Sequence, residues 1–262
     1  MTNSNQMTEN LNDVAYAVLD LAREHRKGAP EIVLASNKDV EQNLSIAAQF
    51  LERTGRAILS RVPAEVEAAL VERYGRDGFE WYRASRIAIL RTKPRPAPTG
   101  GRVGILAAGT SDQAVAEEAA IVCQEMGCTV RSRYDVGVAG LHRLFEPLRQ
   151  LLDVDDVDVI IVAAGMDGAL PSVVSGLVDV PVIGLPTSVG YGMGGEGHGA
   201  LMAMLQTCAP GLAVVNIDNG VGAGVTAAMI ARRAAKQRQG AQRHVGQATD
   251  TDRSDHEPSG EQ

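Results

Sequence analysis

The chain has 262 residues, of which 45% are hydrophobic and 3% aromatic, enough for a sizeable core built from aliphatic side chains. Its formal net charge of -7 and its few aromatic rings argue against a protein whose main ligand is nucleic acid. No apolar run reaches the roughly 18 residues of a membrane span, and the polar N-terminus lacks the apolar core of a signal peptide. Three cysteines make a disulfide framework an unfavourable interpretation, so we expect a cytoplasmic protein with free thiols.

Composition divides the chain into five segments. Residues 1–10 and 236–262 are polar and are predicted to be disordered tails. Residues 93–101 contain alternating prolines followed by two glycines, which is typical of a linker. These bounds leave a small α/β lobe at 11–92 and a larger domain at 102–235.

The small lobe alternates short apolar segments with helical patterns. Strands are predicted at 31–35, 57–62 and 86–90. One helix is predicted near 39–54, where apolar residues recur at helical spacing, and a second helix after Pro63.

The larger domain has the pattern of a parallel α/β sheet. Its predicted strands, at 103–108, 128–136, 157–164, 180–186 and 212–218, are nearly continuous apolar runs, as expected for strands covered on both faces. Helical patterns lie between them, which predicts helices on both sides of the sheet. Ligands of such sheets bind at the carboxyl ends of the strands, so the loops that follow the strands are the candidate sites.

Two of these loops contain groups suited to an anionic ligand. In AAGTSDQAVAEEA (107–119), a helix begins after Gly109, and its free N–H groups could hold a phosphate. A plain capping box of Thr110 with Gln113 explains the same residues. In YDVGVAGLHR (134–143), His142 and Arg143 could bind an anion or transfer a proton, or could simply occupy an amphipathic helix.

The next two loops are rich in glycine. Asp167, in AGMDGALPSVVSGL (164–177), follows the most apolar strand, so we expect a partly desolvated carboxylate that could serve as a base; a turn former is the alternative. PTSVGYGMGGEGHG (186–199) has six glycines, more than one turn needs, which favours a mobile lid or a backbone cradle. His198 in this loop is interpreted as a surface residue.

The fifth segment, MLQTCAPGLAVVNIDNGVGAG (204–224), contains the candidate nucleophile Cys208. Cys123 and Cys128 are instead predicted to be buried hydrophobic residues. Cys208 ends a predicted helix, whose dipole disfavours a thiolate, so activation needs a cation such as Arg143 or a positively charged substrate. Asp218 closes the next strand. It is expected together with Cys208 at the rim of the sheet, the edge formed by the loops that follow the strands. Zinc, P-loop and GxSxG motifs are absent from the sequence.

Taken in order, AAGTSD, YDVGVAGLHR, AGMDGALPSVVSGL, PTSVGYG and CAPGLAVVNIDNG resemble the LarB family of pyridinium-3,5-biscarboxylic acid mononucleotide synthases. The resemblance covers about residues 28–232, including RKGAPEIVLASNK. The same region is more distantly similar to PurE, the carboxyaminoimidazole ribonucleotide mutase, but GLHRLFEP replaces the mutase's Ser-Ala-His-Arg-Thr-Pro run, and the mutase lacks an equivalent of Cys208.

The resemblance implies a PurE-like three-layer fold and a role in nickel-pincer cofactor biosynthesis for lactate racemase. The implied reaction carboxylates C5 of the pyridinium ring of nicotinic acid adenine dinucleotide, from carbon dioxide or bicarbonate, and hydrolyses the phosphoanhydride to release AMP. This reaction uses neither ATP nor biotin. The resemblance also implies a homo-oligomer, between a dimer and an octamer. The residues expected to bind substrate are Gly109, Thr110, Ser111, Asp112, Asp135, Arg143, Gly165, Ser188, Gly190 and Asp218.

Our mechanistic hypothesis is that the Cys208 thiolate adds to C6 of the ring, so that C5 becomes nucleophilic, and that Asp167 removes the C5 proton. His142 is the further acid or base, and Mg²⁺ held partly by Asp112 or Asp135 is expected to assist the hydrolysis. Two other functions stay open. One is the imidazole ribonucleotide mutase, which has no need of a thiol, and the other is a dinucleotide-binding regulator without turnover.

Overall fold

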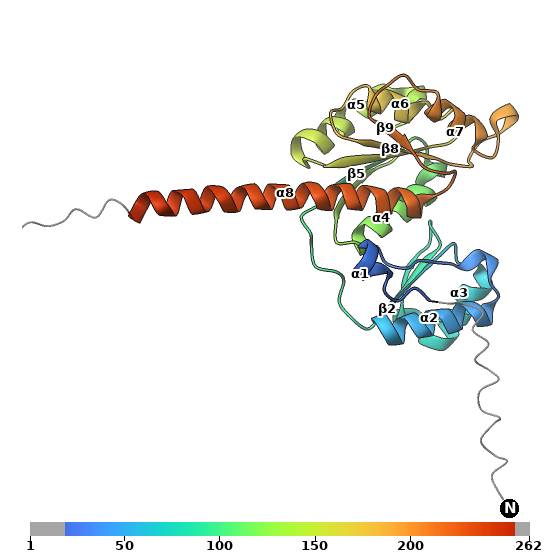
Figure 1. Ribbon diagram of the computed structural model, residues 1–262. Coiled ribbons are helices and arrows are strands. Elements are labelled where there is room, and N and C mark those ends of the chain that lie inside the picture. Colours follow the sequence, from blue (N-terminus) through green and yellow to red (C-terminus); the bar gives the residue numbers. More distant parts are fainter. Residues whose placement is uncertain (1–18, 255–262) are drawn as a thin grey trace, which may run out of the picture.

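The computed structural model describes residues 19–254 of the chain, with side chains as far as residue 241. It has two lobes, each built on its own β-sheet (Figure 1). The tail predicted at residues 1–10 lies outside the described residues, as do residues 255–262. Among the described residues, no helix is both long and apolar enough to cross a membrane.

The N-terminal lobe contains a four-stranded mixed sheet in the order β1-β2-β4-β3, in which only β1 and β2 are parallel. Asp39 caps the second helix: its carboxylate accepts from the Gln42 N–H at 2.8 Å, and the side-chain oxygen of Gln42 accepts from the Asp39 N–H. The predicted strand at 31–35 is only two residues long because a 3₁₀ turn begins at Ala35, and the three-residue β3 was not predicted. The elements are α1 (Arg23–Lys27), β1 (Val33–Leu34), α2 (Val40–Thr54), β2 (Arg56–Ser60), α3 (Ala64–Tyr74), β3 (Glu80–Tyr82) and β4 (Ile87–Arg91).

The larger lobe contains five parallel strands in the order β6-β5-β7-β8-β9. Helices α4 and α8 pack on one face through one apolar cluster, and α5, α6 and α7 cover the other face through a second cluster. The predicted three-layer α/β architecture is therefore confirmed. The elements are β5 (Arg102–Ala107), α4 (Gln113–Glu125), β6 (Thr129–Arg133), α5 (His142–Arg149), β7 (Val159–Ala164), α6 (Ala169–Ser175), β8 (Val182–Pro186), α7 (His198–Leu205), β9 (Leu212–Val214) and α8 (Gly220–Ser254).

Helix α8 continues past Lys236, where the composition predicted the start of a disordered tail, and ends at Ser254 (Figure 1). Residues beyond the predicted boundary still contact the domain: the Arg238 guanidinium pairs with the buried Asp158 carboxylate. Ala, Gln and Arg, which are frequent here, are also good helix formers, so little apolar surface is needed to extend an established helix.

Helix α4 forms much of the contact between the lobes. Glu118, Ile121 and Glu125 lie three and four residues apart, and so share one face of this helix. In the middle of that face, Ile121 packs against isoleucines of β2 and β4.

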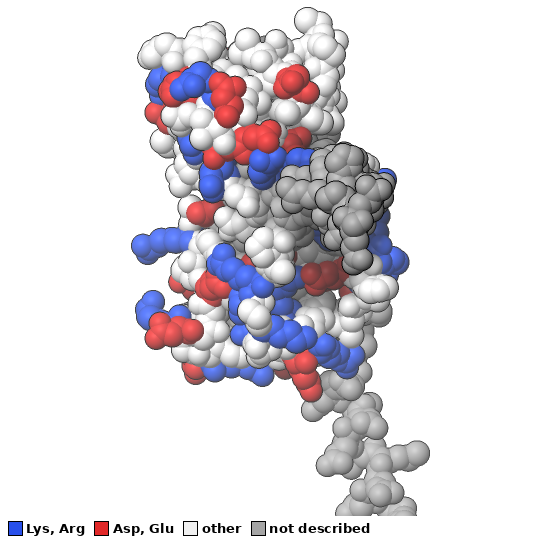
Figure 2. All heavy atoms as spheres, turned by 90° about the vertical axis from the view of Figure 1, so that its left-hand side faces the viewer, with Lys and Arg blue, Asp and Glu red and all other residues white. Residues whose placement is uncertain are grey.

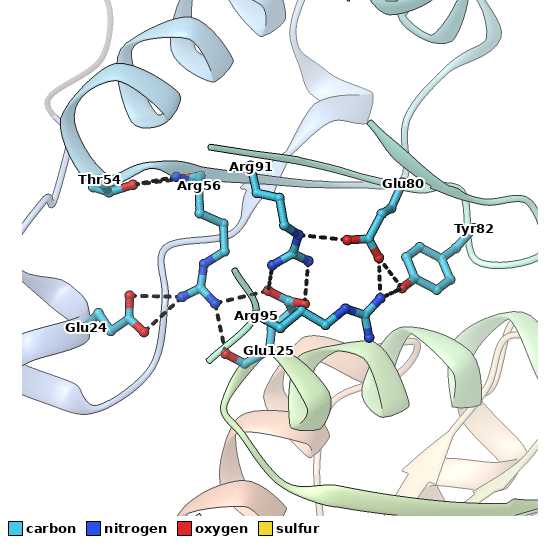
Figure 3. A network of polar contacts seen from close by, with 8 residues as sticks. All are labelled: Glu24, Thr54, Arg56, Glu80, Tyr82, Arg91, Arg95 and Glu125. Atoms are coloured by element: carbon cyan, nitrogen blue, oxygen red, sulfur yellow. Dashed lines mark hydrogen bonds and ion pairs between the residues drawn. The ribbon is translucent and has the colours of Figure 1, made fainter. Parts of the chain in front are cut away.

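At one end of the contact, Glu125 is 1% exposed and meets two arginines of the N-terminal lobe (Figure 3). Its carboxylate lies 3.0 Å from Nη1 of Arg56 and 2.8 Å from Nη2 of Arg91, and Arg56 also donates to its carbonyl. Glu24 and Glu80 complete the pairing of these two arginines. The buried ion cluster and the isoleucines together fix the position of the N-terminal lobe on the larger lobe.

Candidate functional site

The carboxyl ends of the five parallel strands lie at one edge of the larger sheet, and the loops that follow them are joined by hydrogen bonds. The Thr187 hydroxyl, after β8, donates to the Asp112 carboxylate, after β5, at 2.5 Å. The Ser188 N–H donates at 2.8 Å to the Asp218 carboxylate, after β9. The predicted rim of loops is therefore present.

Asp112 is buried, and its two carboxylate oxygens are occupied by protein donors. Besides the Thr187 hydroxyl, it accepts a hydrogen bond of 2.8 Å from the Gly109 N–H. A 3₁₀ turn at Thr110–Asp112 precedes α4, so the capping box expected between Thr110 and Gln113 is wrong. Through its hydrogen bond with Thr187, Asp112 holds the loop after β5 against the end of β8. Thr110 and Ser111 of the same loop are exposed at the rim.

The loop after β6 brings three predicted site residues to this edge. Arg143 pairs with Asp135 at 2.6 Å between Nη1 and Oδ2, and both side chains are well exposed. His142 is exposed at the start of α5, between Leu141 and Arg143. All three side chains can therefore be reached by a ligand at the rim, although Arg143 would have to exchange its partner.

The loop after β7 holds Asp167 differently from the expectation. Asp167 is exposed in the described chain rather than desolvated, because the loop turns outward immediately after the buried Gly165. Its Oδ1 accepts from the Ala169 N–H at 3.3 Å, in the manner of a turn former. Gly165 is required for packing, since a Cβ there would lie 2.0 Å from the Val189 carbonyl oxygen.

The glycine-rich loop between β8 and α7 presents apolar side chains to solvent. Tyr191 is 82% exposed and Met193 is fully exposed, and Gly190, Gly192 and His198 are exposed as well. Across the loop, the Val189 carbonyl accepts from the Met166 N–H at 2.8 Å. Large apolar groups held at a rim in this way are typical of a surface that another molecule covers.

Cys208 lies at the opposite edge of the sheet. The Gly211 carbonyl, three residues later, accepts from the N–H of Val182, the first residue of β8, at 3.0 Å. The Pro210 carbonyl accepts at 2.7 Å from Ser175, the last residue of α6. Both contacts place this segment at the amino ends of the strands, where Cys208 is exposed.

The expectation that Cys208 and Asp218 share one rim within a single chain is therefore wrong, and Arg143 of the same chain does not lie beside this thiol. The five-residue strand β8 separates the two edges by about 16 Å. The order of elements was the signal that could have shown it, because Cys208 precedes a parallel strand instead of following one. Cys123 and Cys128 are buried as predicted, and burial raises the pKa of both thiols.

A cavity of about 270 Å³ opens between the two lobes at the carboxyl edge. The larger lobe contributes Ser111, Glu118, Ser188 and Asp218, together with neighbouring apolar residues. The N-terminal lobe contributes Arg61 and the turn 84–86. A second cavity of about 320 Å³ adjoins it and is also lined by Arg61 and Glu118.

Glu118 is a site residue that the sequence interpretation missed. It is buried, its carboxylate accepts a hydrogen bond from Ser60, and Arg61 approaches to 3.9 Å. Burial raises the pKa of this carboxyl above its ordinary value of 4.5, although Ser60 and Arg61 act in the opposite direction. The helical pattern of Val115, Ala119 and Val122 could have revealed it, because Glu118 falls on the same buried face.

The pKa of Glu118 predicts a pH-dependent stability. A carboxyl whose pKa is higher in the folded chain favours folding below its ordinary pKa, and that contribution is lost as the pH rises through the folded pKa. Glu118→Gln cannot ionise, so its stability relative to the parent protein should increase between about pH 4 and pH 7. Urea unfolding of both proteins at the two pH values measures this, and a difference that does not change with pH would contradict it.

The residues proposed for Mg²⁺ do not fit a metal ion. Asp112 is satisfied by two protein donors, and Asp135 pairs with Arg143. Within residues 19–241, no group of three or more His, Cys, Asp or Glu side chains has an arrangement that could hold a metal ion. We therefore assign no step to a metal at these residues.

Comparison with known proteins adds two family models and several relatives. The model described as AIR carboxylase matches residues 102–251, and the model described as the LarB/PurE-like N-terminal domain matches residues 11–93. An uncharacterised protein of Methanocaldococcus jannaschii is 42% identical over 217 residues, 82% of this chain and 83% of its own. An alignment of that length is too long for either lobe alone.

Several relatives carry the name N5-carboxyaminoimidazole ribonucleotide mutase, in one case as a probable mutase. The one from Methanocaldococcus jannaschii is 33% identical over 125 residues, which are 47% of this chain and 74% of that protein. The one from Thermotoga maritima is 32% identical over 136 residues, which are 49% of this chain and 74% of that protein. The named mutases thus match about half of this chain.

Proposed function

The chain belongs to the AIR carboxylase family of enzymes and carries the LarB/PurE-like N-terminal domain, and from this premise we propose that it carboxylates and hydrolyses nicotinic acid adenine dinucleotide. The products are pyridinium-3,5-biscarboxylic acid mononucleotide and AMP, for nickel-pincer cofactor biosynthesis. The observation that carries the proposal is the cavity at the carboxyl edge, because residues of both matched domains line it. The domain typical of LarB-type proteins thus takes part in the candidate site.

The carboxylation needs a nucleophile, since C5 of a pyridinium ring is too electron-poor to attack carbon dioxide. In the proposed route the Cys208 thiolate forms a bond to C6, and the ring becomes a neutral dienamine. The electron pair then passes to C5, which forms the new carbon–carbon bond. The Asp167 carboxylate accepts the C5 proton, the carbon–sulfur bond breaks, and the thiolate leaves as the ring regains its aromaticity.

The positions of Cys208 and Asp167 require two copies of the chain for this route. The two residues lie at opposite edges of one sheet, so a thiol that reaches a ring at the carboxyl edge belongs to a second copy. Exposed apolar side chains support such a contact at both places. Met202 and Leu205 lie beside Cys208, and Met166, Tyr191 and Met193 lie at the rim.

The hydrolysis breaks the phosphoanhydride between the two nucleotides. Water attacks one phosphorus atom, the bond to the bridging oxygen breaks, and AMP leaves. His142 is exposed at the rim and is the proposed proton-transfer group, and Arg143 is the proposed anion clamp once it leaves Asp135.

A second candidate is the imidazole ribonucleotide mutase. The named mutases at 32–33% identity favour it, and Ser111, Asp112 and His142 lie at the carboxyl edge as that reaction would need. A regulator that binds the dinucleotide without turnover is the third candidate. The exposed Cys208 distinguishes the first candidate, since neither alternative uses a thiol.

Product analysis tests the proposal directly. The protein is incubated with nicotinic acid adenine dinucleotide and ¹³C-bicarbonate, and the products are analysed by mass spectrometry. We expect a mononucleotide that has gained one labelled carboxylate, together with an equal amount of AMP. Turnover of N5-carboxyaminoimidazole ribonucleotide in a parallel reaction, without change in the dinucleotide, would establish the mutase instead, and dinucleotide binding with no product would support the regulator.

A further inference from the structure

The larger lobe is poorly equipped to bind an anion by itself. Residues 102–235 contain 7 Lys and Arg against 14 Asp and Glu, a difference of -7, and Arg143, in the first turn of α5, is the only predicted site residue among these cations. That arginine is already paired with Asp135. The N-terminal segment 11–93 contains 13 Lys and Arg against 12 Asp and Glu. On the face that Figure 2 shows, Lys and Arg gather mainly over the lower half, where the N-terminal lobe lies.

Two arginines of the N-terminal lobe reach the cavity at the carboxyl edge, from the end of β2 and from the turn before β4. Arg61 is held in place, because its guanidinium donates to the Asp218 carbonyl and lies 3.9 Å from the Glu118 carboxylate. Arg86 is exposed and lines the same cavity, and its guanidinium has no hydrogen bond or ion pair with any residue from 19 to 241. Its charge is therefore available to a ligand.

A buried hydroxyl next to Arg86 also lacks a partner. Ser85 is 7% exposed, and its backbone N–H donates to the Glu117 carboxylate at 2.9 Å, which fixes the turn on α4. Its Oγ, however, is buried and makes no hydrogen bond with the described residues, although Ser85 is one of the residues that line the cavity. Buried hydroxyls are normally satisfied, so a free one in a cavity points to a ligand acceptor.

The backbone supports the same interpretation. Arg61 and Arg86 have φ values of 54° and 52°, in the left-handed region that residues with a Cβ rarely adopt. Strained conformations of this kind cluster at binding and active sites. Both arginines thus occupy positions where glycine would be easier for the backbone, and both line the cavity between the lobes.

We propose that Arg86 and Ser85 bind a phosphate group of the substrate, with Arg61 as a positioning residue, so that the N-terminal lobe holds the adenylate phosphate of the dinucleotide. Arginine presents several N–H donors to phosphate oxygens, and the Ser85 hydroxyl adds one more from the buried side. Ser111 and Ser188, on the opposite wall, are within the same cavity. This inference rests on the proposed function, since it assigns part of that substrate to part of that site.

Binding of AMP and adenosine to the full chain tests it. Calorimetric titration should show that the parent protein binds AMP at least tenfold more tightly than adenosine. In Arg86→Ala this ratio should fall to near one, with adenosine affinity unchanged, and Arg86→Lys should keep part of it. Ser85→Ala should weaken AMP binding severalfold without lowering the melting temperature, because its Oγ has no protein partner to lose.

Arg83→Ala is the matched control, since Arg83 is an exposed arginine of the same turn that does not line the cavity. If the ratio of AMP affinity to adenosine affinity is the same in Arg86→Ala as in Arg83→Ala, the inference is overturned. A parent protein that binds AMP no better than adenosine would overturn it as well. The proposed function is tested separately by product analysis. An Arg86-dependent AMP affinity without carboxylation would remove only the proposed function, and carboxylation with an unchanged KM in Arg86→Ala would remove only the inference.

Discussion

Cys208→Ala should abolish ring carboxylation, with a loss of about a thousandfold or more in kcat, because no other exposed thiol is present to form the adduct. The same loss is expected for Asp167→Asn, which keeps the turn but cannot accept the C5 proton. Since the two residues lie at opposite edges of the sheet, each active site should combine Cys208 of one copy with Asp167 of another. An equal mixture of the two variants, unfolded and refolded together, should therefore recover roughly a quarter of the parent rate, the fraction of contacts in which both partners are intact.

In the control experiment, Cys208→Ala is mixed with the double variant Cys208→Ala/Asp167→Asn instead of with Asp167→Asn. This mixture should recover no carboxylation activity. Native mass spectrometry verifies that the mixed assemblies form. Two results would refute the two-copy site: normal carboxylation by Cys208→Ala, or mixed assemblies that remain inactive. Both substituted side chains are exposed in the chain, so loss of folding is not the expected cause of inactivity.

Glu125→Ala should destabilise the protein by about 3–5 kcal/mol, since it leaves two arginines without their buried partner. Arg56 is 12% exposed and Arg91 is 15% exposed, so solvent cannot fully replace the lost carboxylate. The effect should be largest in the N-terminal lobe, which is fixed to α4 through this cluster. Urea unfolding followed both by far-UV circular dichroism and by the fluorescence of Trp81, the single tryptophan, separates the lobes, because Trp81 lies in the N-terminal sheet.

Glu146→Ala is the comparison, because Glu146 also pairs with an arginine but does so at the surface. Its unfolding midpoint should equal that of the parent protein. If Glu125→Ala unfolds at the same midpoint as Glu146→Ala, the buried cluster does not fix the lobes. If the fluorescence of Trp81 changes at a lower urea concentration than the circular dichroism does, the N-terminal lobe unfolds first.

The local order of the chain was largely readable from its residues. Apolar runs separated by helical patterns predicted the parallel sheet, and the glycine-rich turns after the strands correctly marked its carboxyl edge. The burial of Cys123 and Cys128 also followed from their positions in a helical pattern and at the start of a predicted strand. The exposure of Asp167 did not, because an apolar strand says nothing about how far the next turn projects from the sheet.

The sequence by itself determined the α/β architecture and the loops that form the rim, because periodicity and turn residues act over a few neighbours along the chain. Only the tertiary structure decided that Cys208 lies at the far edge from Asp218, and that Glu118, Ser85 and Arg86 share a cavity. These relations depend on the direction of the strands and on how the N-terminal sheet packs against α4. Both are set by contacts between residues distant in the chain, which local patterns do not encode.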